Sequence, residues 1–205
     1  LSFAVSHAQV DANGYTTVNA TMGASYANRV FVDLSANQLT SQPANTWDIA
    51  FWRNNSMQFG TRINDAQNIE VYQASGNPAD WDNINVANIS SWGNPLYNPD
   101  LTDYLYSGAL EQTTANTSCT GQFNVGWGCY NIGTHHIDGK VIFVLNYPNN
   151  TYVKFMISDY FGGYTFKYAK SNASGWEATQ TKTVAIGSAD QYFNYFSFET
   201  NDVIA

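Results

Sequence analysis

Aromatic and β-branched residues between positions 141 and 168 constrain the fold of this chain more than any other feature. Residues 141–145 and 152–160 each read as a long strand, and the Tyr-Pro-Asn-Asn segment 147–150 between them is typical of a turn. After two glycines, residues 164–168 alternate, with three aromatic side chains on one face. Aromatic pairs across neighbouring strands stabilise antiparallel sheets. The sequence therefore predicts an antiparallel meander in its last third.

The composition favours strands throughout the chain. Of 205 residues, 16% are aromatic and only 12% are charged, against about 25% charged residues in an average chain. Thr, Tyr, Phe, Trp and Val suit pleated, half-buried surfaces, so we expect an all-β protein that forms a single β-domain over residues 1–205. The 16 acidic and 8 basic residues give a net charge of −8. This charge argues against a nucleic-acid partner, because a protein that binds nucleic acid needs a basic face.

The pattern predicts further strands and one short helix. The additional strand segments are 29–34, 47–53, 57–62, 68–73 and 192–198. We expect 57–62 and 68–73 to pair with each other. Residues 101–110 are the best helical candidate because their apolar residues recur at helical spacing.

One internal similarity joins the two ends of the sequence. Residues 195–203 align with residues 31–39, because both have an aromatic residue, a polar one, an apolar one and a shared Asn at matching places. Two readings remain open. The segments are two strand-plus-turn units with common β chemistry, or residues 188–205 begin a second repeat rather than form a closing strand.

Two cysteines, Cys119 and Cys129, are separated by nine residues that include three glycines. A lone pair supplies neither a four-cysteine zinc set nor a Cys-x-x-Cys redox motif. We predict a local disulfide that closes a hairpin, which requires an oxidising compartment. The first residues lack the basic segment of a signal peptide, so we expect no signal segment in this chain.

Two sequence features together resemble a known family. Trp47-Asp-Ile-Ala-Phe51 followed by Arg53, combined with the later run from Lys140 to Tyr168, is similar to the HmuY-like family of haem-binding lipoproteins. The resemblance spans residues 25–170. It implies an antiparallel β-sandwich or meander with few short helices. It also implies a bacterial protein of the periplasm, outer-membrane surface or extracellular space that scavenges haem and delivers it to an outer-membrane receptor.

The resemblance does not supply the haem ligands. In the family, His or Met side chains ligate iron from the middle region and from a position shortly after the Trp that corresponds to Trp127. Here Ile132 stands at the second position, and residues 74–125 contain neither His nor Met. The candidates for a haem or metal ligand are His135 and His136, in a turn-rich stretch where both imidazoles could reach one ion. Met22, Met57 and Met156 are possible soft ligands as well, although methionine more often fills a core. The alternative is a structural turn with one exposed histidine.

Trp81 and Trp92 are candidates for a ligand-binding surface. Their segments show no strand alternation, so we expect these rings to be exposed, as in surfaces that bind sugars or peptides. The alternative is that they belong to the β core.

The sequence predicts a binding protein rather than an enzyme. It contains no nucleophile elbow, no His-Glu-x-x-His and no phosphate-binding P-loop. We expect an exported haem- or small-ligand-binding protein for iron acquisition. The rival expectation is a cell-surface structural, self-assembling or glycan-binding adhesive module, in which a terminal strand with an open edge pairs with the next subunit.

Overall fold

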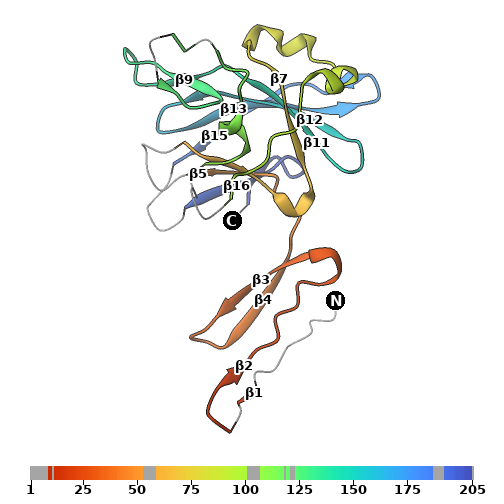
Figure 1. The fold of residues 1–205 in the computed structure, drawn as a ribbon, viewed down its shortest axis with the longest axis vertical. Helices are drawn as coiled ribbons and strands as arrows, with labels where there is room; N and C mark the ends of the chain where they lie inside the picture. Colours follow the sequence, from red (N-terminus) through yellow and green to blue (C-terminus); the bar gives the residue numbers. More distant parts are fainter. Residues whose placement is uncertain are drawn as a thin grey trace. The chain divides into compact units, whose positions relative to one another are not determined.

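The computed structural model describes residues 9–10, 12–52, 59–100, 107–117, 119–120, 123–186 and 192–204. Within these residues the protein is mostly β, with antiparallel sheets and only short 3-10 turns (Figure 1). The predicted all-β class is thereby confirmed. The chain divides into two compact units, Leu1–Thr46 and Trp47–Ala205. The expectation of a single β-domain stays a prediction.

The described part of the first unit, residues 9–10 and 12–46, forms two hairpins and one 3-10 turn. Its elements are β1 (Gln9–Val10), β2 (Thr16–Thr17), η1 (Ala24–Tyr26), β3 (Asn28–Asp33) and β4 (Gln38–Pro43). β1 pairs with β2, and β3 pairs with β4, both antiparallel. Gly14 lies between β1 and β2 with a φ of 82°, which glycine adopts without strain. The strand predicted at 29–34 is confirmed within one residue at each end.

In the part of the second unit that the structure describes, the larger sheet has nine strands. They are β7 (Glu70–Ser75), β8 (Phe123–Asn124), β9 (Gly128–Tyr130), β10 (Ile137–Gly139), β11 (Ile142–Asn146), β12 (Tyr152–Tyr160), β13 (Gly163–Asn172), β14 (Gly175–Trp176) and β15 (Gln180–Ala185). Its main path runs β14-β13-β12-β10-β9-β8, while β11 joins β12 to β7 and β15 pairs with β13. The predicted meander is confirmed as β11, β12 and β13. Phe155 lies opposite Phe143 on one side and Tyr168 on the other.

A second sheet has four strands in the order β17-β16-β5-β6. These are β5 (Ile49–Trp52), β6 (Thr61–Ile63), β16 (Phe193–Ser197) and β17 (Asp202–Ile204). The remaining 3-10 turns are η2 (Asp65–Gln67), η3 (Pro78–Asn83), η4 (Val86–Ser91) and η5 (Ala109–Gln112). Strands are confirmed within the segments 47–53 and 192–198. Of the helical candidate 101–110, residues 101–106 lie outside the described residues, and the end of the segment begins η5.

The predicted pairing of segments 57–62 and 68–73 is wrong, although β6 and β7 form within or next to them. β6 pairs with β5, and β7 pairs with β11 of the other sheet. The chain changes sheets at η2. The Asn64 side chain donates a hydrogen bond to the carbonyl oxygen of Trp47 at 2.8 Å, and Asn68 ends the turn in the left-handed conformation. The Asn64 side chain thus ties the end of β6 to the segment before β5, and the left-handed turn at Asn68 leads the chain to the other sheet.

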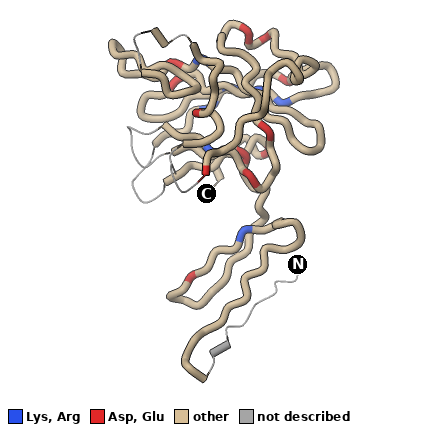
Figure 2. The backbone as a smooth tube through the Cα atoms, viewed as in Figure 1, with Lys and Arg blue, Asp and Glu red and all other residues tan. Residues whose placement is uncertain are grey.

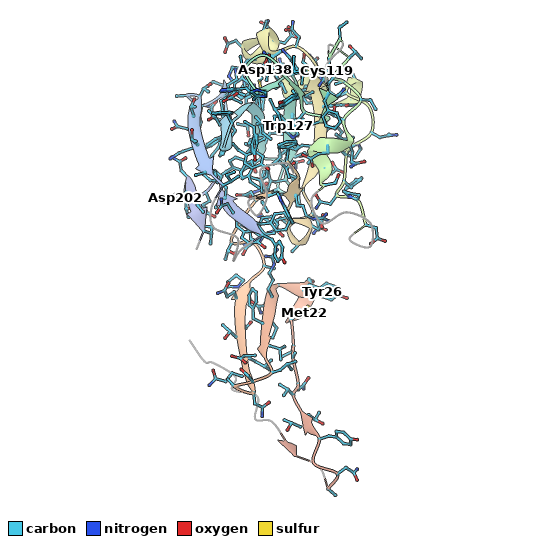
Figure 3. The ribbon with its side chains drawn as sticks, turned by 90° about the vertical axis from the view of Figure 1, so that its left-hand side faces the viewer. Met22, Tyr26, Cys119, Trp127, Asp138 and Asp202 are labelled. Atoms are coloured by element: carbon cyan, nitrogen blue, oxygen red, sulfur yellow. A yellow bond between two sulfur atoms is a disulfide. The ribbon has the colours of Figure 1, made fainter. Side chains whose placement is uncertain are left out.

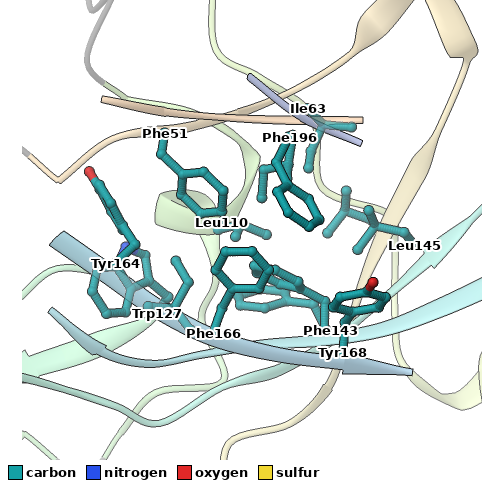
Figure 4. Packing of buried hydrophobic residues seen from close by; sticks show 14 of the residues in the cluster. Phe51, Ile63, Leu110, Trp127, Phe143, Leu145, Tyr164, Phe166, Tyr168 and Phe196 are labelled. Carbon is teal, nitrogen blue, oxygen red and sulfur yellow. The ribbon is translucent and has the colours of Figure 1, made fainter. Parts of the chain in front are cut away.

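The two sheets of the second unit share one aromatic core (Figure 4). Phe51 of β5 stacks on Phe166 of β13 with 5.1 Å between ring centroids, and Phe196 of β16 meets the same ring edge-on at 5.0 Å. Trp127 is fully buried in this core. Each such side chain contributes roughly 1.5–3 kcal/mol by leaving water, so the core holds the two sheets together.

Charged residues are sparse along the chain (Figure 2), and one of them, Asp48, is buried. Its Oδ1 accepts hydrogen bonds from the Tyr147 hydroxyl at 2.9 Å and from Gln67 Nε2 at 3.0 Å. Its Oδ2 accepts one from the backbone N–H of Phe198 at 2.7 Å. One carboxylate therefore fastens the end of β16 to both the β11–β12 turn and η2.

Candidate functional site

The two candidate histidines lie in a turn between β9 and β10, and polar side chains shape this turn. The Asn131 side chain accepts a hydrogen bond from the backbone N–H of Gly133 at 3.0 Å, and Thr134 Oγ1 accepts one from the N–H of His136 at 3.3 Å. The N–H of His135 donates to the Asn131 carbonyl oxygen at 2.8 Å. His135 has a φ of 63°, an uncommon conformation for a residue other than glycine. The turn thus presents consecutive histidines at the end of a rigid sheet.

His136 is held in place on two sides. Its Nδ1 lies 2.8 Å from Oδ1 of Asp159 on β12, and its ring stacks on Phe161 with 4.4 Å between centroids and 6° between planes. The His136 side chain is 36% exposed. A carboxylate on one ring nitrogen fixes the ring orientation and makes the other nitrogen, Nε2, a better ligand.

His135 is engaged by a different partner. Its Nδ1 lies 2.6 Å from the hydroxyl of Tyr130, the last residue of β9. The Nδ1 atoms of the two histidines are therefore directed to separate groups, Tyr130 and Asp159. Among the described residues, no group of three or more His, Cys, Asp and Glu side chains could hold a metal ion. A ligand at this turn would be held by imidazole and neighbouring apolar surface.

Exposed apolar side chains occur on the segments around this turn. Phe123 on β8 is 68% exposed, Ile132 in the turn 77%, and Phe161 after β12 62%. β8 pairs with β9 so that Phe123 lies opposite Tyr130. Large apolar side chains that gather at a surface indicate a binding site more often than isolated ones do. Of these side chains, Phe161 is the one that stacks on His136, so the turn places an apolar ring beside a nitrogen ligand.

The expectation that Trp81 is exposed is wrong, because only 6% of the residue is accessible. It lies in η3, and its Nε1 donates a hydrogen bond to Thr179 Oγ1 at 3.0 Å. Its ring lies under two cations, Lys154 Nζ at 4.5 Å and Lys167 Nζ at 4.3 Å from the centroid. Trp81 is part of a smaller apolar cluster that packs on β11, β12 and β13.

Trp92 is half-buried and packs against the same cluster as Trp81. Trp176 completes it, donating from Nε1 to the carbonyl oxygen of Ile84 at 2.7 Å. Lys154 is 3% exposed, and its ammonium donates to the carbonyl oxygen of Trp81 at 2.6 Å. Burial lowers the pKa of this lysine. The tryptophans thus cover a sheet face and its lysine, and a role of Trp92 in a ligand-binding surface stays a prediction.

The predicted disulfide between Cys119 and Cys129 is confirmed. It joins the segment before β8 to β9, with 5.4 Å between the Cα atoms, and Cys119 is labelled in Figure 3. Asn116 lies beside it and donates from Nδ2 to the Gly126 carbonyl oxygen at 3.1 Å. A disulfide of this kind is typical of proteins that fold in an oxidising, extracytoplasmic compartment.

Replacing both cysteines with serine is expected to lower the free energy of unfolding by about 2–3 kcal/mol, because the unfolded chain regains the freedom of the closed loop. Urea unfolding followed by tryptophan fluorescence measures this change. The parent protein treated with a thiol reductant should lose the same stability. Equal midpoints for the parent and the double serine variant would contradict this structural role.

Sequence reasoning missed one partly buried acid, Glu111 of η5. Its Oε2 accepts hydrogen bonds from the backbone N–H groups of Gly108 at 2.6 Å and Thr61 at 3.0 Å. Burial raises the pKa of this carboxyl to about 7. Gly108 is essential to the arrangement because a Cβ there would lie 1.2 Å from the Thr61 carbonyl oxygen. The near-helical spacing of residues 101–110 gave no indication of this contact with β6.

Comparisons with protein-family models, with curated proteins and with solved structures find no match for this chain. The described part of the chain contains no helix that is long and apolar enough to cross a membrane. Function is therefore argued from the residues themselves.

Proposed function

We propose that this chain is an exported, non-enzymatic binding protein of the β-sandwich type, and that its ligand is a flat, apolar metal macrocycle such as haem. The observation that carries the proposal is the geometry of His136. Its ring is fixed by Asp159 and Phe161, which leaves Nε2 as the ligating atom. Histidine is the most common protein ligand of haem iron, and haem-binding histidines gain basicity from such carboxylate contacts.

The surroundings of His136 suit the macrocycle as well as the iron. Phe161 stacks on the imidazole and remains 62% exposed, so its ring and Ile132 offer apolar surface to a porphyrin face or edge. His135, anchored through Nδ1 to Tyr130, is the alternative candidate for this ligand. In this proposal the protein binds and protects the ligand and does not transform it.

Titration of the purified protein with hemin tests the proposal. We expect a shifted Soret band in the parent. We expect His136→Ala to weaken binding by more than about tenfold, and Asp159→Asn to weaken it by about tenfold because the ring loses its orienting carboxylate. His7→Ala is the matched control, with binding unchanged. No Soret shift in the parent, or a shift that both His135→Ala and His136→Ala leave intact, would contradict the proposal.

A further inference from the structure

Two hairpins at opposite ends of the sequence have the same construction. β3 and β4 are joined by a turn over residues 34–37, and β16 and β17 by a turn over residues 198–201. The pairs flanking the turns correspond, with Asp33 opposite Gln38 in one hairpin and Ser197 opposite Asp202 in the other. The structure thus extends the sequence similarity between residues 31–39 and 195–203 to a similarity of register.

The two turns also use the same chemistry. Asp33 Oδ1 accepts hydrogen bonds from the N–H groups of Ser35 and Ala36, both at 2.9 Å. Ser197 Oγ occupies the corresponding place and accepts from the N–H groups of Glu199 at 3.2 Å and Thr200 at 3.5 Å. Both turns end in an asparagine with positive φ, 54° at Asn37 and 59° at Asn201. The hairpins are therefore structural equivalents.

Their apolar residues differ sharply in exposure. Phe196 and Phe198 are 1% and 2% exposed, whereas the residues at the same places in the first hairpin, Val32 and Leu34, are 46% and 88% exposed. Figure 3 labels Met22 and Tyr26, which precede β3 and are 46% and 71% exposed. The hairpin β3–β4 thus carries exposed apolar residues at the positions where the hairpin β16–β17 packs into the core.

The contacts of the buried hairpin β16–β17 indicate which surface the exposed hairpin β3–β4 would fit. β16 pairs with β5 so that Tyr195 lies opposite Ala50 and Phe196 opposite Ile49. The backbone N–H of Asp48 donates to the Phe196 carbonyl oxygen at 2.9 Å, and the Asp48 carboxylate accepts from the Phe198 N–H at 2.7 Å. Among the described residues, β3 pairs with β4 alone. A strand that presents apolar residues and an edge is a template for pairing with another sheet.

We propose that the hairpin β3–β4 docks on the β5 edge of a second copy of this protein, where it takes the place of β16–β17. Phe31 then lies opposite Ala50 of the second copy, and Val32 lies opposite its Ile49. Leu34 enters the site of Phe198, with its backbone N–H directed to the Asp48 carboxylate. This interaction is separate from the ligand binding proposed above.

The docking requires a second copy whose own hairpin has left the β5 edge. In an intact copy, Phe196 and Phe198 fill that edge, and they bury more apolar surface than Val32 and Leu34 would. The exposed hairpin is therefore selective for an open edge and does not displace a filled one.

Mixing a donor chain with an acceptor chain tests the proposal. The acceptor carries Phe196→Asp and Phe198→Asp to open its β5 edge, and Val32→Asp and Leu34→Asp to disable its own first hairpin. The donor is the unaltered protein, and the matched control donor carries Val32→Asp and Leu34→Asp.

Size-exclusion chromatography with light scattering should show a complex of one donor and one acceptor. The control donor should bind more than about tenfold more weakly, since two buried charges oppose docking. No complex, or equal binding by the control donor, would overturn the proposal.

A chimera tests the same point if the acceptor does not fold. In this chain, the sequence of residues 29–40 replaces residues 193–204. We expect a cooperative thermal transition and a far-ultraviolet dichroism spectrum like that of the parent. A matched chimera with Val32→Asp and Leu34→Asp built into the graft should lose both. A first chimera without a cooperative transition would overturn the equivalence of the two hairpins.

Discussion

Replacing Asp48 with alanine is expected to lower the free energy of unfolding by about 3 kcal/mol, because the variant leaves buried donors without their acceptor. The Tyr147 hydroxyl, the Gln67 amide and the Phe198 N–H all donate to this carboxylate. Because the Phe198 bond closes the turn after β16, the variant should also loosen the hairpin β16–β17. Urea unfolding gives the free energy, and limited proteolysis reports the freed hairpin.

Two further variants separate the role of this carboxylate from a general loss of charge. Asp48→Asn keeps one oxygen acceptor at the site and should cost about half as much as the alanine variant. Asp202→Ala removes an exposed carboxylate from β17 and should change the stability by less than about 0.5 kcal/mol. If Asp48→Ala and Asp202→Ala unfold at the same urea concentration, Asp48 does not hold the two sheets as described.

The second large effect is a pH dependence that comes from Glu111. Burial raises the pKa of its carboxyl from 4.5 to about 7 in the folded protein. The folded state therefore keeps a proton that the unfolded state releases between these two values. The contribution of this group to stability is greatest below pH 4.5 and falls as the pH rises to about 7.

Glu111→Gln isolates this contribution because a glutamine keeps the shape and does not titrate. Its oxygen can accept from the N–H groups of Thr61 and Gly108, and its amide can donate to Thr61 Oγ1, which lies 3.1 Å from Oε1 in the parent. Relative to this variant, the parent should lose about 3 kcal/mol of stability between pH 4.5 and pH 7. Urea unfolding at a series of pH values measures the difference. A constant difference across that range would contradict the assignment.

The elements that follow from local sequence pattern were predictable. The strands β11, β12 and β13 result from apolar runs interrupted by turn residues, and the Cys119–Cys129 disulfide from a short spacing rich in glycine. Both features depend on residues that are close together in the chain. The similarity of residues 31–39 and 195–203 was likewise visible, and it corresponds to two hairpins of equal register.

Features that depend on distant segments were not predictable. The pattern of β12 places Lys154 on a polar face, but the carbonyl oxygen and ring of Trp81, far away in the sequence, cover it. The burial of Trp81 was missed for the same reason, because its contacts with Lys154 and Thr179 join segments that are far apart in the sequence. The pairing of β6 with β5 depends on the turn at Asn64, whose bond to Trp47 no periodicity reveals. Leu34 is exposed and Phe198 is buried because only the hairpin β16–β17 pairs with β5 in this structure. The local sequence patterns of the two hairpins are alike, so they do not reveal this difference.

Hydrogen–deuterium exchange of the donor chain, with and without the acceptor, shows whether β3 pairs with the β5 edge of a second copy. If β3 takes the place of β16 on the β5 edge of a second copy, the amides of residues 28–34 should exchange more slowly in the mixture, and the control donor with Val32→Asp and Leu34→Asp should show no change. Unchanged exchange over residues 28–34 in a mixture that forms a complex would show that β3 does not dock on the β5 edge.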